Sequence, residues 1–434
     1  MNSFEVHAAW LNPCKMIGTC FIDRMRGKEV ISFQYDPTWL SDHAGFFIDP
    51  DIYAISGRQY PPDNKPCFGF LADTAPDRWG RLLISRKERM DAAAEGRLKK
   101  TLMQSDYILR VCDEGRIGGL RYWDSETGSY LSDRDAFSVP PMEDLRKLEA
   151  AASSADIMDA DDSWVRTLCS PGSSLGGARP KANVVDENGD IWIAKFPAKN
   201  DEYNMEAWEM VAHDLAMQCG LIVPDARLIS LSNKGATYLS KRFDRVGGAD
   251  AMRVHYLSAM TALGENDDSD NEIGYIDIAS VVEQRCDRVT GNLNELWRRM
   301  VFNICVSNTD DHLRNHGFIL RDGKWELSPV FDCNPNVDKV DLSLLVGDSY
   351  EKSLTNAIEI SGFFRIDKDT ALKEAVRICD TVQHGRTALA DKYSISKNEQ
   401  RYMEEAFSSS QNELVILKRK NFTLPSGEQA NPIQ

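Results

Sequence analysis

An asparagine stands between two aspartates in the second half of the sequence, at spacings that suit phosphoryl transfer. Asp310 is followed five positions later by Asn315, and Asp332 comes seventeen positions after Asn315. Transfer of a phosphoryl group from a nucleotide needs one aspartate to accept the proton of the attacking hydroxyl, and an asparagine and a second aspartate to hold magnesium. The three residues therefore predict a phosphotransferase that uses ATP and Mg2+, with Asp310 as the catalytic base and Asn315 and Asp332 as metal ligands.

Charged residues inside the same stretch leave an alternative open. We expect His312 and Arg314 to steady the loop or to contact the γ-phosphate, whereas phosphoryl transfer assigns no role to Asp311. Taken alone, Asp310 and Asp311 could equally form a capped, exposed turn. The choice depends on whether the rest of the chain provides a nucleotide site.

The elements on either side would hold these residues in place. Apolar residues between positions 297 and 305 recur at spacings of three and four, which predicts a buried helix face. After the stretch, a turn at Asp322-Gly323 separates two predicted strands, and Asp332 follows the second strand. The polar residues are therefore expected between a core helix and a hairpin.

The stretch 170–181 is the richest in glycine and serine, and it leads into two predicted strands joined by a tight turn. Its backbone N–H groups could cover phosphates, and Lys195 in the second strand would contact the α- and β-phosphates. Because Ala182 follows Lys181, the stretch is not a Walker loop. An ordinary hairpin with a flexible lead-in is the alternative for this segment alone. The nucleotide-binding residues predicted here are Ser173, Ser174, Leu175, Gly176, Gly177, Ala178, Lys181 and Lys195.

A helix and a further strand would complete the small lobe of a kinase. Residues 204–220 carry one apolar face and end at a glycine, which predicts a helix. Its Glu209, with Glu206 as second choice, would pair with Lys195 and orient the phosphates. The strand that follows, residues 236–245, would carry the hinge that binds adenine, with Lys241 and Phe243 as cofactor contacts.

Length, net charge and cysteine content limit the classes of protein to which this chain can belong. The chain has 434 residues, so two or three domains are expected. A net charge of −16 argues against binding nucleic acid through bulk positive charge. The ten cysteines are scattered without a C-x-x-C pair, which fits reduced thiols in a cytoplasm. We expect no signal peptide, and no apolar run reaches the length that spans a membrane.

The order of the predicted elements indicates an α+β protein with a sheet-rich N-terminal subdomain, a two-lobed core resembling a protein kinase, and a mainly helical C-terminal lobe. Near position 76 we expect a helix capped by Asp73 or Thr74, with Pro76 in its first turn. We accordingly interpret Asp73, Asp77 and Arg81 as structural, and a functional site formed by these three residues is the alternative. The predicted boundaries are 1–125 for the N-terminal subdomain, 126–165 for a connector, 166–245 for the small lobe, 246–420 for the large lobe and 421–434 for a frayed tail.

At these residues the sequence resembles the HipA family of bacterial serine/threonine kinases, the toxins of type II toxin–antitoxin modules. The resemblance covers nearly the whole chain, and its motifs are more specific together than separately. They are Phe68–Asp73, Pro76–Arg81, Asp113–Gly118, Ser174–Lys181, Lys195, Arg242–Arg245, Asp310–Asn315 and Asp332.

The resemblance implies a protein kinase that phosphorylates serine or threonine, with an aminoacyl-tRNA synthetase as the best-known kind of target and growth arrest or persistence as the outcome. Ser174 matches the serine that the family autophosphorylates. The implied partner is a HipB-like helix-turn-helix antitoxin, which would bring this acidic chain to DNA only indirectly. Lys241 departs from the pattern, because the best-known member has an acidic residue there, and this leaves the substrate open.

Two other functions are compatible with parts of the sequence. A small-molecule kinase of similar fold would use the same aspartates and asparagine, and the serines of the glycine-rich stretch favour a protein kinase only weakly. A repressor partner without catalytic activity would need neither the aspartates nor the asparagine. The presence of Lys195, Asp310, Asn315 and Asp332 argues against that second alternative.

Overall fold

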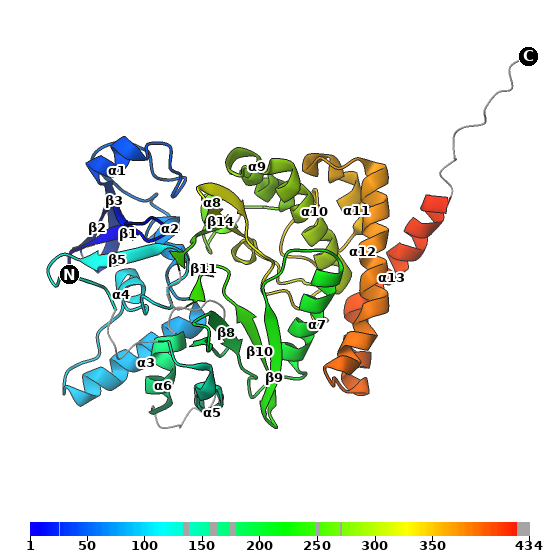
Figure 1. Ribbon diagram of the computed structural model, residues 1–434, viewed down its shortest axis with the longest axis horizontal. Helices are drawn as coiled ribbons and strands as arrows, with labels where there is room; N and C mark the ends of the chain where they lie inside the picture. The colour runs from blue at the N-terminus through cyan, green and yellow to red at the C-terminus, as the bar shows by residue number, and fades with distance from the viewer. Residues whose placement is uncertain are drawn as a thin grey trace, which may run out of the picture.

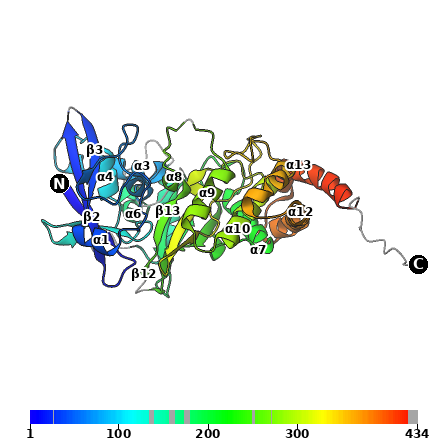
Figure 2. The same cartoon turned by 90° about the horizontal axis from the view of Figure 1, so that it is seen from above.

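A computed structural model describes residues 1–25, 27–132, 139–155, 163–172, 179–248, 252–269 and 271–422. The N-terminal sheet lies at one end of the molecule, a second sheet lies in the middle, and the long helices α12 and α13 lie at the other end (Figure 1; Figure 2 shows the same order from above). The candidate catalytic residues come from the middle of this arrangement.

The N-terminal subdomain is built on an antiparallel sheet whose strands run in the order β4-β3-β2-β1-β5-β6. Phe4, Val6 and Ala8 of β1 are buried, whereas Glu5 and His7 face outward, which is the alternation expected of a half-buried strand. Helices cover the inner face. The elements are β1 (Ser3–Ala8), β2 (Lys15–Met25), β3 (Lys28–Tyr35), α1 (Pro37–Asp42), β4 (Arg58–Gln59), α2 (Gly69–Asp73), α3 (Arg78–Ala94), α4 (Gln104–Leu109), β5 (Leu120–Asp124) and β6 (Ser129–Tyr130).

The expectation of a helix capped by Asp73 or Thr74 is wrong. Helix α2 ends at Asp73, and α3 begins at Arg78 with Asp77 as its N-cap residue. Asp73 cannot cap α3 because its carboxylate accepts hydrogen bonds from the backbone N–H and the hydroxyl of Ser258, at 2.8 and 2.6 Å, and from the hydroxyl of Thr261. Asp73 therefore docks the N-terminal subdomain on the core.

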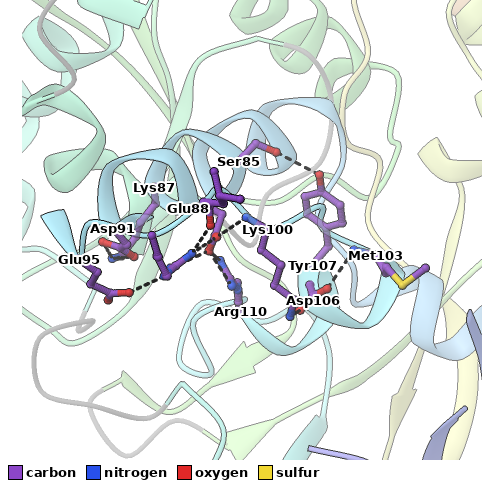
Figure 3. A network of polar contacts seen from close by, with 12 residues as sticks. Ser85, Lys87, Glu88, Asp91, Glu95, Lys100, Met103, Asp106, Tyr107 and Arg110 are labelled. Atoms are coloured by element: carbon purple, nitrogen blue, oxygen red, sulfur yellow. Dashed lines mark hydrogen bonds and ion pairs between the residues drawn. The ribbon is translucent and has the colours of Figure 1, made fainter. Parts of the chain in front are cut away.

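A buried carboxylate fixes the segment that follows α3. Glu88 accepts hydrogen bonds from the guanidinium groups of Arg97 and Arg110 and from the backbone N–H of Lys100 (Figure 3). These partners hold its pKa at about 2 against the opposing effect of burial. The carboxylate thus ties the end of α3 to the loop before α4.

The second sheet is antiparallel and has the strand order β7-β8-β10-β9. Helix α7 packs against β9 and β10. Helices α5 and α6 lie in and just after the region that we expected to be a connector. Their apolar residues share a core with this sheet and with Trp79 and Leu83 of α3. The elements are η2 (Met142–Asp144), α5 (Leu145–Ala155), α6 (Ser163–Gly172), β7 (Lys181–Val185), β8 (Ile191–Lys195), α7 (Met205–Gln218), β9 (Ala226–Ser232) and β10 (Gly235–Lys241).

The large lobe packs its helices around α10, whose Trp297 is fully buried and donates from Nε1 to the carbonyl of Ala357 at 2.8 Å. The helix predicted from the apolar residues between 297 and 305 is present as the second half of α10. The elements are β11 (Arg245–Val246), β12 (Met252–Arg253), β13 (His255–Ser258), α8 (Ala259–Ala262), α9 (Tyr275–Arg285), α10 (Val289–Val306), η4 (Leu313–Asn315), β14 (Gly317–Arg321), β15 (Lys324–Leu327), α11 (Leu354–Glu359), η5 (Ser361–Phe364), α12 (Lys368–Lys392) and α13 (Lys397–Phe422).

Candidate functional site

A cavity of about 240 Å³ lies where the N-terminal subdomain, the second sheet and the large lobe meet. Ten of the predicted site residues lie within the described part of the chain, and eight of these line the cavity. Among the described residues, its lining is Asp73, Ala75, Asp77, Ile117, Lys181, Ile193, Lys195, Glu209, Tyr238, Ser240, Arg242, Phe243, Asp244, Tyr256, Ser258, His312, Arg314, Asn315, Phe331 and Asp332.

Lys195 at the end of β8 bridges two carboxylates in this cavity. Its Nζ donates to Glu209 Oε1 on α7 and to Asp332 Oδ1, each at 2.6 Å. Burial lowers the pKa of Lys195, but the two carboxylates outweigh burial and leave that pKa above its ordinary value. The preferred partner Glu209 is thus in place, whereas Glu206 pairs with Arg179 at 2.7 Å. The charged ammonium group of Lys195 faces the cavity, and such a group can pair with a phosphate.

Asp332 and Asn315 occupy one side of the cavity. The charge of Lys195 holds the pKa of Asp332 below its ordinary range, so the group is a carboxylate. Asp332 has a φ of +58°, a conformation that turns the chain sharply after the hairpin. Asn315 Nδ2 donates to the carbonyl of Asp310 at 3.0 Å, which leaves the amide oxygen of Asn315 for a ligand. A carboxylate and an amide oxygen are ligands that suit Mg2+.

Asp310 lies outside the cavity lining. Its side chain is 66% exposed and pairs with Lys339 Nζ at 3.0 Å. The structure therefore places the predicted base where a hydroxyl arriving from solvent can reach it.

Asp311, for which the sequence offered no role, is buried beneath the loop. It accepts hydrogen bonds from the hydroxyl of Tyr275 and from His316 Nε2, the latter at 2.9 Å. Asn303 of α10 donates to the same tyrosine oxygen at 3.1 Å and accepts from the thiol of Cys333, the neighbour of Asp332. This polar network connects the loop that carries Asp310 with the loop that carries Asp332.

His312 and Arg314 both line the cavity. Nδ1 of His312 is buried and has no hydrogen-bond partner among the described residues, so a phosphate oxygen would satisfy it. Arg314 donates hydrogen bonds from Nε and Nη2 to the carboxylate of Asp267, at 2.9 and 2.8 Å. Burial lowers the pKa of Arg314, and the pairing with Asp267 more than offsets that effect.

The predicted adenine contacts separate into two groups. Phe243 lies in the cavity, with its ring centroid 5.6 Å from that of Phe331 and 6.2 Å from that of Tyr256, so these rings form an aromatic wall. Lys241 points away and pairs with Asp190 at 2.6 Å. Strand alternation explains the position of Lys241, because Tyr238 and Ser240 on the other face of β10 line the cavity. Phe243 lies beyond the end of this strand, so the alternation does not extend to it.

Lys181 also lines the cavity. Burial, followed by the charge of Lys195, lowers its pKa. The predicted residues Ser173, Ser174, Leu175, Gly176, Gly177 and Ala178 lie outside the described residues.

Comparison with known proteins places this site in a family. The model of the HipA-like C-terminal domain matches residues 173–389, which is half of the chain. The chain belongs to the HipA family. The match includes Lys195, Glu209 and the stretch from Asp310 to Asp332.

A solved structure of a HipA protein shares the fold of this HipA-family chain. A chain from the complex of Shewanella oneidensis MR-1 HipA, HipB and its operator DNA aligns over 97% of this chain and 100% of its own length, with a TM-score of 0.67 and 15% identity. This likeness confirms the predicted α+β fold. The proinflammatory kinase CtkA of Helicobacter pylori aligns over 58% of this chain and 94% of its own, with a TM-score of 0.43 and 16% identity.

Among curated proteins, a kinase candidate of Haemophilus influenzae is 24% identical over 179 residues, which make up 37% of this chain and 52% of that protein. The chain thus spans about half the length of this curated relative. None of the described helices is long and apolar enough to cross a membrane.

The N-terminal subdomain of this HipA-family chain contributes lining that sequence reasoning missed. Asp73, Asp77 and Ile117 all reach the cavity. Asp73, Asp77 and Ile117 belong to the three N-terminal motifs of the family resemblance, which were the only sequence signal for a role in the site. The spacing of these motifs did not show that they would face the cavity.

Proposed function

We propose that this HipA-family chain is an ATP- and Mg2+-dependent serine/threonine protein kinase and the toxin of a toxin–antitoxin module. The observation that carries the proposal is the bridge from Lys195 to Glu209 and Asp332 in a cavity that Asn315 also lines. A lysine positioned by a helix glutamate, together with an asparagine and an aspartate, is the set that phosphoryl transfer requires.

Each group has a defined task in the proposed reaction. Lys195 would contact the α- and β-phosphates, and Asn315 and Asp332 would hold Mg2+, which would supply positive charge against the phosphates. Asp310 accepts the proton of the attacking hydroxyl as the oxygen bonds to the γ-phosphorus and the bond to the β-phosphate oxygen breaks. His312 satisfies its buried Nδ1 with a phosphate oxygen.

The exposure of Asp310 favours a protein substrate. A small molecule would need a second subsite that encloses it beside the base, whereas a serine or threonine on a folded partner can reach an exposed base from solvent. We therefore keep an aminoacyl-tRNA synthetase, the kind of target that the family resemblance implies, as the substrate hypothesis. Small-molecule phosphorylation is the alternative outcome of the test below.

Autophosphorylation at Ser174 is part of the proposal. A phosphoserine carries about −1.5 to −2 charges, which would repel the phosphates of ATP from the adjoining stretch and stop the enzyme. This would give the toxin a route to self-inactivation.

The antitoxin hypothesis rests on charge and on the likeness to a chain from a complex that also holds HipB and operator DNA. With a net charge of −16, this chain is poorly suited to bind DNA alone. A helix-turn-helix partner would supply the basic surface.

Purified protein incubated with ATP and Mg2+ tests the proposal directly. The wild type is expected to carry phosphate on Ser174 and to label protein in a cell lysate, and Asp310→Ala is expected to reduce transfer by about 10²-fold or more. Asp322→Asn, in the exposed hairpin turn, is the matched control and should behave like wild type. Absence of any transfer by the wild type would favour the inactive repressor, and label confined to small molecules would favour the alternative kinase.

A further inference from the structure

A nucleophilic cluster lies on the outer face of the N-terminal sheet, apart from the nucleotide cavity. Of the ten cysteines, all of which lie within the described residues, Cys14 is exposed and the other nine are buried, and none forms a disulfide. The hydroxyl of Tyr130 donates to Cys14 Sγ at 3.6 Å.

The imidazole beside this thiol is itself held by a carboxylate. Glu5 Oε2 lies 2.9 Å from His7 Nε2, and Nδ1 of the same ring lies 3.2 Å from the hydroxyl of Tyr130. Ser125 donates to the other oxygen of Glu5 at 2.5 Å. The Tyr130 hydroxyl therefore links the Cys14 thiol to an imidazole that Glu5 orients. A thiol that accepts a hydrogen bond beside a partly protonated imidazole ionises more readily than a free one.

Strand register explains why these residues meet. Glu5 and His7 lie on the outward face of β1, where Glu5 pairs with Trp123 and His7 with Arg121 of β5. Trp123 in turn pairs with Tyr130 of β6. The strands β1 and β5 are neighbours at the N-terminal end of the molecule (Figure 1). The cluster therefore comes from three strands and the loop before β2, and not from one flexible segment.

The charges around Cys14 favour the thiolate. Burial raises the pKa of Cys14, but hydrogen bonds from His7 and Tyr130 and the charges of His7 and Arg121 bring it below the ordinary value of a thiol. The Arg121 guanidinium lies 3.4 Å from the centroid of the Tyr130 ring. Lys15, the next residue along the chain, instead faces Asp42 of α1 at 3.5 Å.

A metal site does not account for this cluster. Within the described part of the chain, no group of three or more His, Cys, Asp or Glu side chains is placed to hold a metal ion. Thiol chemistry is the function that an exposed Cys14 with an oriented imidazole can perform.

We propose that Cys14 is a thiol-modification site that forms a mixed disulfide with a low-molecular-weight disulfide such as glutathione disulfide. Cys14 Sγ attacks one sulfur of the reagent, a new S–S bond forms as the old one breaks, and the departing thiolate takes up the proton that the Cys14 thiol loses. Cys14 is oxidised to a mixed disulfide, and one molecule of reduced glutathione is released. Glutathione disulfide is itself the oxidant, so the step needs no other one.

The test treats the full folded chain with glutathione disulfide, without ATP, and follows it by intact mass spectrometry and peptide mapping. One adduct is expected, on the peptide that contains Cys14, and dithiothreitol should remove it. Cys14→Ser should take up none. Because nucleotide is absent, the result is independent of the proposed kinase activity.

His7→Gln distinguishes an activated thiol from one that is merely exposed. Its rate of adduct formation at pH 7 is expected to be roughly fivefold lower than that of wild type, with convergence at alkaline pH where the thiol ionises unaided. Tyr130→Phe should lower the rate in the same direction, whereas Lys15→Ala, the matched neighbour, should leave it unchanged. The proposal is overturned if the folded chain forms no adduct, if the buried cysteines react equally, or if His7→Gln reacts at the wild-type rate throughout.

Discussion

At the scale of single residues, Lys195 is the cation on which the site depends. It is 13% exposed, and its partner Glu209 is 7% exposed, so neither charge is well solvated. A buried charge that loses its partner destabilises a protein far more than an exposed one does. Lys195 therefore has a structural role in addition to the phosphate contact proposed for it.

Lys195→Met is expected to abolish phosphate transfer and to lower the free energy of unfolding by about 3 kcal/mol, because Glu209 is left buried with Asp332 and no cation. Chemical denaturation and ATP titration measure the two effects. Lys397→Met, which removes a surface partner of Asp391, is the control and should change stability by less than about 1 kcal/mol. An unchanged stability of Lys195→Met would contradict the buried bridge, and an unchanged ATP affinity would contradict its phosphate contact.

At the scale of elements, α9 and α10 position two loops at once. Tyr275 of α9 and Asn303 of α10 meet at one oxygen, and from there the network runs to Asp311 on one side and to Cys333 on the other. Both helices are tightly packed, since Tyr275 is fully buried and Asn303 is 4% exposed. The relative position of Asp310 and Asp332 is thus set by buried groups that do not line the cavity.

Tyr275→Phe keeps the ring and removes the hydroxyl group that donates to Asp311 and accepts from Asn303. We expect a loss of about 1–3 kcal/mol in stability, because Asp311 keeps its burial and loses a donor. We also expect a lower kcat with little change in KM for ATP, since Lys195 and Phe243 are untouched. Tyr402→Phe, at an exposed tyrosine of α13, is the control. Equal falls in kcat for both variants, or none for either, would show that the network does not position the loops.

The sequence predicts the elements of the site better than their connections. The Lys195 strand, the Glu209 helix and the Asp310 to Asp332 order follow from period and spacing, because each pattern is local. The role of Asp311 depends on Tyr275, which is 36 residues away, and that of Asp73 depends on Ser258, which is 185 residues away. Such contacts leave no local pattern, so they could not be predicted.

At the scale of the whole molecule, His255 lies buried between the N-terminal subdomain and the large lobe. Its ring stacks on Trp10 with centroids 4.4 Å apart, and neither ring nitrogen has a hydrogen-bond partner among the described residues. Burial lowers its pKa to about 3. The joint between the two parts therefore requires a neutral imidazole.

The lowered pKa of His255 predicts a loss of stability in mild acid. The unfolded chain takes up a proton as pH falls below about 6.5, whereas the folded chain does not until about pH 3. Stability is therefore fully present above pH 6.5 and falls by up to about 1.4 kcal/mol per pH unit below it. Between pH 7 and pH 5, His255→Phe should lose about 2 kcal/mol less than wild type in urea denaturation. His384→Asn, at an exposed histidine, should track the wild type, and a slope for His255→Phe equal to that of wild type would contradict this prediction.

The N-terminal subdomain and the nucleotide cavity are also joined by buried charges. Asp244 accepts from Arg242 Nη2 at 2.6 Å, from Arg245 Nη1 at 2.9 Å and from the backbone N–H of Gly118 at 2.7 Å. Both guanidinium groups also donate to the carbonyl of Arg116. Burial raises the pKa of Asp244, but the two guanidinium groups outweigh it and keep the group ionised. The turn at 113–118 is thus bound to residues that line the cavity.

Asp244→Asn tests whether subdomain and cavity form one unit. The variant keeps the shape and leaves two buried guanidinium groups without a countercharge, so we expect a loss of about 3 kcal/mol or more. ATP affinity should fall as well, because Arg242 and Asp244 line the cavity, and protease should cleave near residues 113–118 sooner than in wild type. Asp190→Asn, which breaks the partly exposed pair with Lys241, is the control and should cost less than about 1 kcal/mol. If Asp244→Asn binds ATP like wild type while only the N-terminal subdomain loosens, the subdomain is an appendage to the nucleotide site and not a part of it.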